Sequence, residues 1–371
     1  METAFDVALG VAGVLLVALT LDSAVRTFVL PRGVTVMYTR IVFVSMRRMF
    51  VAVMHFTKTY EARDRVMALY APLTLLVLPF VWIVMTGTGF TLLFRSVGIE
   101  PWRRAFEMSG SSMLTLGFVQ PPDTLPAMVL AFFEAGIGLG LLALLIAYLP
   151  TIYSAFSKRE VLVAQLSVRA GTPPSAFALL RRAHLTGEIE LLDDVWVPWQ
   201  TWFAEVEETH TSLGVLSFFR SPQADRSWIT AAGVVLDSAA LAQSTLAVRW
   251  SPQAAVCIRS GFLALRQVAD LFGIPYDPDP AQGDPISIAR EEFDELYEEL
   301  AAAGVPMRPD RERCWREFAG WRVNYDAVLI GLAGLVMAPY AVWSSDRSLR
   351  YRRPRILFRR RKPKPRDDVP R

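Results

Sequence analysis

A four-residue turn at residues 115–118 combines residue types that can coordinate a cation through backbone oxygens. The sequence there is Thr-Leu-Gly-Phe, after a serine-rich segment and before two prolines. Thr115 supplies both a hydroxyl and a carbonyl, and Gly117 permits the dihedral angles that aim successive carbonyls the same way. Rings of such carbonyls can replace the hydration shell of an ion that crosses a bilayer. The candidate filter residues are Thr115, Leu116, Gly117, Phe118 and Val119.

The flanking segments predict how this turn is positioned. A short amphipathic segment precedes it, Pro121 and Pro122 break the chain after it, and a long apolar run at 127–156 carries one charge, Glu134. Non-helical backbone at membrane depth is tolerated only where protein buries it or it lines a water-filled cavity. The dipole of the short helix also points one end at the ion path. This order of elements predicts a re-entrant pore loop.

At these residues the chain resembles the tetrameric potassium-channel superfamily, whose filter reads Thr-Val-Gly-Tyr-Gly followed by Asp. Residues 115–118 match the first four filter positions, whereas Val119 stands at the second Gly and Gln120 at the acidic residue. The resemblance covers residues 66–157. It implies a two-transmembrane-plus-pore-loop core, a homotetramer around one axis, and potassium as the permeating ion.

Other residues of the same region are candidates for supporting or gating the turn. Glu134 lies near the outer end of the long apolar run, where it could hydrogen-bond Ser109, Ser111 or Ser112 behind the filter. An ionisable group at membrane depth is a functional hypothesis by default, and direct attraction of the ion or a bystander role stay open for it. The run also carries three glycines that could form a gating hinge or only allow close helix packing: Gly136, Gly138 and Gly140.

Composition and charge divide the chain into a membrane part and a soluble part. Of the 371 residues, 53% are hydrophobic and 20% are charged. Residues 1–157 hold eleven Lys/Arg and nine Asp/Glu, residues 158–343 hold sixteen and twenty-four, and residues 344–371 hold twelve and three. We therefore expect an all-α polytopic membrane protein with an acidic helical cytoplasmic domain at 158–343 and a basic, disordered tail at 344–371 that lies on anionic lipid headgroups.

Apolar runs and charge bias predict three spans and their orientation. The first transmembrane helix falls in residues 1–31, and Asp22 and Arg26 can pair on one of its faces. Residues 32–65 form a basic connector, expected as an amphipathic helix in the cytoplasmic interface. Residues 66–157 hold the outer helix, the pore helix with the filter, and the inner helix. The positive-inside rule places the N-terminus outside and the large C-terminal domain in the cytoplasm. We expect a multi-pass protein of the plasma membrane.

Two segments of the C-terminal half resemble a fourth transmembrane helix and a calcium-binding loop, but the sequence argues against both. The apolar segment 327–343 is short, contains Pro339, and would carry the basic tail outside if it crossed the membrane, so we expect a buried helix. In the acidic loop at 275–285, an EF-hand beginning at Asp277 would require Gly at its sixth position and Glu at its twelfth, but Gln282 and Ile288 stand there. Cys257 and Cys314 are expected to be buried free thiols.

The sequence argues against an enzyme. Its three histidines stand in no metal or nucleophile motif. His210, with its two neighbouring glutamates, is expected on a solvated helix face. We expect no cofactor, no nucleic-acid partner and no metal beyond the permeating ion.

The sequence therefore predicts a homotetrameric cation channel, potassium-conducting, with the helical cytoplasmic domain as its regulator. Two alternatives stay open. The β-branched Val119 resists the conformation that the family's second Gly adopts, which favours a non-selective monovalent cation channel that also passes sodium. The other alternative is a membrane-anchored sensor or scaffold with a vestigial pore.

Overall fold

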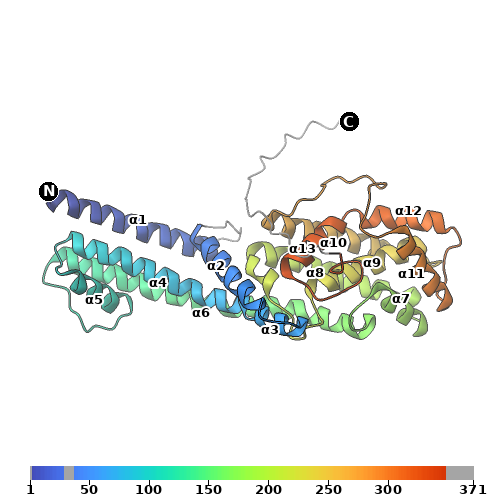
Figure 1. The fold of residues 1–371 in the computed structure, drawn as a ribbon, viewed down its shortest axis with the longest axis horizontal. Helices are drawn as coiled ribbons and strands as arrows, with labels where there is room; N and C mark the ends of the chain where they lie inside the picture. Colours follow the sequence, from blue (N-terminus) through green and yellow to red (C-terminus); the bar gives the residue numbers. More distant parts are fainter. Residues whose placement is uncertain (1, 29–36, 348–371) are drawn as a thin grey trace, which may run out of the picture. The chain divides into compact units, whose positions relative to one another are not determined.

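The computed structural model describes residues 2–28 and 37–347, whose regular structure is helical (Figure 1). Within these ranges the only β pairing is an isolated antiparallel bridge between Leu246 and Met307. The prediction of an all-α chain is confirmed for these residues. The chain divides into two compact units: an N-terminal unit of Met1–Val161 with Glu208–Ala224, and a C-terminal unit of Leu162–Glu207 with Asp225–Arg371.

The first six helices are α1 (Glu2–Phe28), α2 (Met37–Met54), α3 (Tyr60–Ala68), α4 (Tyr70–Ser96), α5 (Trp102–Met113) and α6 (Leu125–Ala170). In the part of the chain that the structure describes, three stretches are long and apolar enough to cross a bilayer: Ala4–Thr27, Tyr60–Ser96 and Leu125–Ala170. Three membrane-length helices were predicted, and their number and order are confirmed. The last of them does not end near residue 157, because α6 continues as one helix to Ala170.

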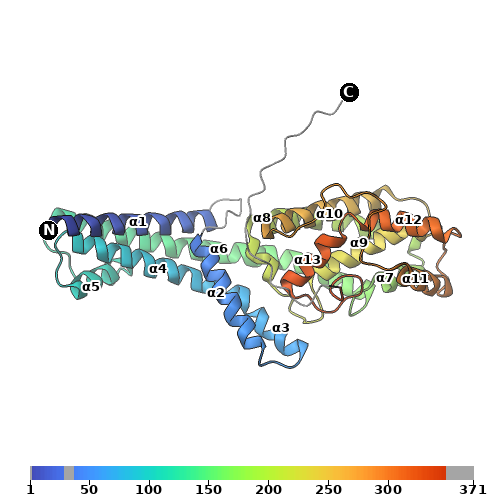
Figure 2. The ribbon, with the colours of Figure 1, turned by 45° about the horizontal axis from the view of Figure 1, so that its top comes forward.

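Within the N-terminal unit, α1, α4 and the first part of α6 run side by side, and α5 lies at the same end as the N-terminus of α1 (Figures 1 and 2). Helices α1 and α4 touch backbone to backbone. A Cβ added at Gly13 would lie 2.7 Å from the carbonyl oxygen of Gly89, and one at Gly89 would lie 2.7 Å from Val17. Trp82 of α4 donates its indole N–H to Ser23 of α1 at 3.2 Å. Close approach at small residues and the hydrogen bond between Trp82 and Ser23 thus contribute to this pairing, as is typical of helices that pack in membranes.

The described part of the connector, 37–65, forms α2 and most of α3, and α2 packs against α4. Tyr70 at the start of α4 donates its hydroxyl to the carbonyl of Phe43 in α2 at 3.2 Å. Its ring also meets Phe50 and Phe218 edge-on, with ring centroids 5.8 and 5.6 Å away. Phe218 belongs to the segment Glu208–Ala224, which is far away in sequence.

The C-terminal unit contains α7 (Ala176–Leu185), most of α8 (Asp193–Ser212), α9 (Trp228–Thr245), α10 (Pro252–Phe272), α11 (Arg290–Ala302), α12 (Arg311–Arg322) and α13 (Asp326–Val336). Helix α9 is buried at every position, and α7, α10, α12 and α13 pack around it (Figure 1). Of the segment 327–343, expected as a buried helix, only the part up to Val336 is helical, as α13, and its apolar side chains belong to the same core; the helix ends at Met337, which has a left-handed backbone, and residues 337–343 are not helical. Cys257 and Cys314 are free and buried, as predicted.

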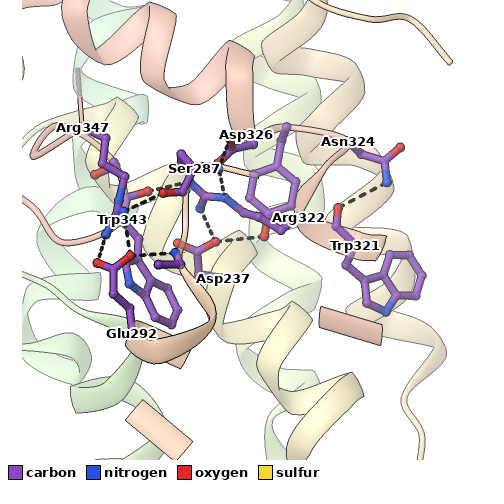
Figure 3. Close-up of polar contacts among 12 residues, drawn as sticks. Asp237, Ser287, Glu292, Trp321, Arg322, Asn324, Asp326, Trp343 and Arg347 are labelled. Atoms are coloured by element: carbon purple, nitrogen blue, oxygen red, sulfur yellow. Dashed lines mark hydrogen bonds and ion pairs between the residues drawn. The ribbon is translucent and has the colours of Figure 1, made fainter. Parts of the chain in front are cut away.

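A buried arginine joins four parts of this unit (Figure 3). The guanidinium of Arg322 donates to Asp326 at 2.8 Å, to Asp237 of α9, and to the carbonyl of Trp343. Burial opposes its charge, but the two carboxylates outweigh burial and raise the pKa of Arg322 above its ordinary value. Ser287 donates its hydroxyl and its backbone N–H to Asp326 at 2.7 and 2.8 Å. The paired charges meet the condition under which a buried ion is tolerated.

The compact units do not coincide with the expected domains. The pore domain was expected to end at residue 157 and the cytoplasmic domain to occupy 158–343, whereas the N-terminal unit runs to Val161 and also includes Glu208–Ala224. The reason lies in contacts that the sequence does not show. Arg220 forms an ion pair with Asp64 of α3. Arg159, fully buried near the end of the apolar part of α6, donates to the carbonyls of Leu216 and Phe219 at 2.8 and 2.7 Å.

Candidate functional site

The short helix before the candidate filter is α5, and it is anchored by one face. Ala105 and Met108 of α5 are fully buried in an apolar cluster with Phe94 of α4 and Ala127 of α6. The charged residues Arg103 and Arg104 lie on its exposed side, and Glu107 pairs with Arg103 at 2.7 Å. The amphipathic pattern expected for a pore helix therefore positions α5 against the two long helices, with its last turn leading directly into residues 115–118.

The backbone of the turn takes left-handed dihedral angles at two alternate positions. Thr115 has φ +53° and Gly117 has φ +71°, whereas Leu116 between them does not have positive φ. Glycine adopts this region at no steric cost, but a β-branched residue such as Thr115 is strained there, on the order of 1–3 kcal/mol. The amide of Leu116 donates to the carbonyl of Ser111 at 2.8 Å, which fixes the turn to the last turn of α5. Strain held in place by its surroundings is a feature of ligand-binding backbone.

Ser111 and Ser112 both hold the turn, by different groups. The hydroxyl of Ser111 accepts the backbone N–H of Val119 at 3.1 Å, so the chain that leaves the turn is bound to the helix that enters it. Ser112 contributes its carbonyl, which accepts the N–H of Thr115 at 3.0 Å. The side chain of Val119 packs against the apolar cluster behind the turn, whereas Leu116 and Phe118 are exposed in a single chain.

Glu134 lies behind the turn and is fully buried. Its Oε1 lies 2.5 Å from Oγ of Ser109 in α5, and the same hydroxyl lies 2.9 Å from the carbonyl oxygen of Gly87 in α4. One serine of α5 therefore bridges α4 and α6. The sequence predicted Ser109 as one of three possible partners for Glu134. Nothing in the sequence indicated that Ser109 would also contact the carbonyl of Gly87.

The three glycines of α6 have different surroundings. A Cβ at Gly138 would lie 2.1 Å from the carbonyl oxygen of Met113, at the end of α5, so this position requires the smallest residue. Gly136 and Gly140 have open space around their Cβ positions. Gly140 lines an open apolar groove of about 500 Å³ between α1 and α6. The helix is continuous through all three glycines.

A polar cluster near residue 159 was missed from the sequence. Arg159 also lies 3.1 Å from Nε2 of His210, which is buried rather than on the solvated face that was expected. The expectation was wrong because helical spacing shows neighbours on one helix and not a partner 51 residues away. Among the described residues, no group of three His, Cys, Asp or Glu side chains could hold a metal ion.

Comparisons with protein-family models, with curated proteins and with solved structures find no match to this chain. The geometry of residues 102–138 therefore carries the functional argument by itself.

Proposed function

We propose that this chain is one subunit of a homotetrameric cation channel of the plasma membrane, potassium-conducting, with the carbonyls of residues 115–118 as its filter. The observation that carries the proposal is the pair of left-handed residues, Thr115 and Gly117, in a turn tied to the end of a short helix between two membrane-length helices. Irregular backbone at membrane depth needs a reason of this kind. Four chains are required because one turn cannot surround an ion.

The proposed topology follows from charge. The N-terminus faces outward, the basic segment that includes α2 and α3 lies on the cytoplasmic side, and the C-terminal unit is cytoplasmic. The C-terminal unit is the regulatory part, and the protein acts as a channel and not as an enzyme. The basic tail that would contact anionic lipid lies outside the described residues, apart from its first four positions.

One observation favours the non-selective alternative. Val119 is turned toward the apolar cluster and its N–H is bound to Ser111. A filter that ends at Phe118 would have fewer carbonyl rings than the five-residue filter of the potassium-channel superfamily. Fewer coordination sites leave less opportunity to discriminate potassium from sodium, so the measurement must compare the two ions.

The test is flux of potassium and of sodium through the purified protein in liposomes, with Gly117→Ala as the variant. A Cβ at Gly117 has open space, so alanine acts through the strained backbone angle alone. We expect loss or change of selective flux. Gly98→Ala is the matched control, because Gly98 is also left-handed with open space, at φ +89°, and lies before α5. Equal potassium and sodium flux through the wild-type protein would establish a non-selective channel.

Gly117→Trp provides the stronger perturbation. We expect it to abolish flux while the tetramer stays intact by size-exclusion chromatography. Equal flux in wild type and Gly117→Trp would contradict the filter. A wild-type protein without flux under any condition would move the assignment to a membrane-anchored sensor or scaffold.

A further inference from the structure

The bridge formed by Glu134 raises a question of hydrogen counting. A serine hydroxyl has one hydrogen, and a backbone carbonyl and a carboxylate are both acceptors only. Oγ of Ser109 lies within hydrogen-bond distance of two such oxygens, in Gly87 and Glu134. With Glu134 ionised, Ser109 can donate to only one of them, and the other contact brings two lone pairs together. With a hydrogen on Glu134, each contact has its own donor.

The second carboxyl oxygen gives independent support. Oε2 of Glu134 is buried and has no hydrogen-bond partner among the described residues. A buried carboxylate is tolerated when it is paired with a cation or receives several hydrogen bonds. Within the described residues Glu134 has neither, because its carboxyl group forms no ion pair and its hydrogen-bond partner is the hydroxyl of Ser109. A neutral carboxylic acid with one bare carbonyl oxygen costs much less to bury.

The charged groups of the surrounding helices do not compensate. In α5, Arg103 and Arg104 are exposed, and Glu107 is engaged by Arg103. In α4, Arg95 pairs with Glu100 at 3.0 Å and lies over the ring of Trp102. Asp123 of the loop before α6 is exposed and acidic. None of these side chains forms an ion pair with Glu134.

We infer that Glu134 is a neutral carboxylic acid that donates its hydrogen to Ser109, which in turn donates to Gly87, and that this relay fixes the pore helix between α4 and α6. Glu134 is thus a positioning residue rather than an ion ligand. The relay also defines a mode of regulation for the proposed filter. Ionisation of Glu134 removes the hydrogen that it donates to Ser109 and leaves an unpaired negative charge behind the turn. Alkaline conditions should therefore loosen the turn.

The test of the protonation state does not depend on channel activity. Infrared difference spectra of the full-length protein in liposomes at neutral pH, wild type minus Glu134→Gln, should show the carbonyl band of a protonated carboxylic acid. Ser109→Ala should shift that band, because its hydrogen bond is lost. Glu107→Gln, which removes an ion-paired carboxylate from α5, should leave the band unchanged. Carboxylate bands in the Glu134→Gln difference spectrum would overturn the inference.

The positioning role rests on the proposed function and has a separate readout. Wild-type selectivity for potassium over sodium should fall as pH rises, and this loss should be absent in Glu134→Gln, whose amide also donates to Ser109. Glu134→Ala should lower selectivity several-fold at every pH. Equal selectivity in the alanine and glutamine variants would exclude the relay as a positioning device. Absence of flux in all forms, with the acid band present, would reject the channel and retain the protonation state.

Discussion

At the scale of single residues, the candidate site depends on which positions of α6 are occupied by glycine. Gly138 allows α6 to pass the end of α5, with its Cβ position 2.1 Å from the carbonyl of Met113. Gly136, one half-turn away, has open space. The two glycines look equivalent in the sequence, and only the packing of α5 against α6 distinguishes them.

This difference predicts that the same substitution has a large effect on stability at Gly138 and a small one at Gly136. Gly138→Ala should destabilise the protein by about 1–3 kcal/mol, because the added methyl group forces α5 and α6 apart. Gly136→Ala should change stability by no more than about 1 kcal/mol, because alanine only raises helix propensity there. Thermal unfolding in detergent compares the two. Similar losses in both variants would mean that α5 does not pack on Gly138.

At the scale of elements, the segment Glu208–Ala224 matters because it belongs to the N-terminal unit despite its place in the sequence. Arg159 of α6 donates to Leu216, Phe219 and His210. The protection of backbone amides in 208–224 against hydrogen exchange should therefore depend on the side chain of Arg159. We expect Arg159→Met to reduce protection in this segment by an order of magnitude or more while α9 keeps its protection.

Arg169→Met is the matched control for that measurement. Arg169 lies on the same helix, but it is half exposed and reaches Glu188 only at 4.0 Å. Exposed pairs of this kind contribute about 0–1 kcal/mol. Protection in 208–224 should be unchanged in Arg169→Met, and a loss equal to that of Arg159→Met would show that the effect is not local.

At the scale of the whole molecule, the stability of the fold should decrease at acidic pH because of an ion pair made by Arg347 near the C-terminal end of the described chain. Arg347 donates to both carboxyl oxygens of Glu292 in α11 (Figure 3), and this hydrogen bonding holds the pKa of Glu292 below its ordinary value. A carboxyl group whose pKa is lower in the folded state than in the unfolded state stabilises the fold at pH values above its unfolded pKa, which is about 4.3 for Glu. This stabilisation is lost as the pH falls through the lower pKa of the folded state. The pair is partly exposed, so the effect should be modest.

The measurement is the thermal midpoint of the full-length protein from pH 6 to pH 3. Wild type should lie above Glu292→Gln at pH 6, and the two should converge as pH falls. Glu295→Gln, at an exposed position of the same helix, serves as the control and should show no such convergence. A constant gap between wild type and Glu292→Gln would contradict the argument.

Much of the helical architecture could be predicted because it is encoded locally. Apolar length shows the three membrane-length helices, and i,i+4 spacing shows the ion pair of Asp22 and Arg26, which is confirmed at 2.7 Å. Serine, threonine and glycine in a short segment indicate a turn at 115–118. The carbonyl partners could not be predicted: Ser109 meets Gly87, and Arg159 meets Leu216, through backbone oxygens that every residue carries. Their selection depends on tertiary packing alone.

The discontinuous N-terminal unit also sets the order in which the protein can fold during synthesis. The helices α1 to α5 and the part of α6 up to Val161 emerge from the ribosome first, but the unit that they belong to includes residues up to Ala224. Until that point the buried guanidinium of Arg159 and the carboxylate of Asp64 have no access to their partners at Leu216 and Arg220. The three membrane-length helices are therefore synthesised before the N-terminal unit is complete, because its last residue, Ala224, lies more than fifty residues beyond Ala170, the end of α6.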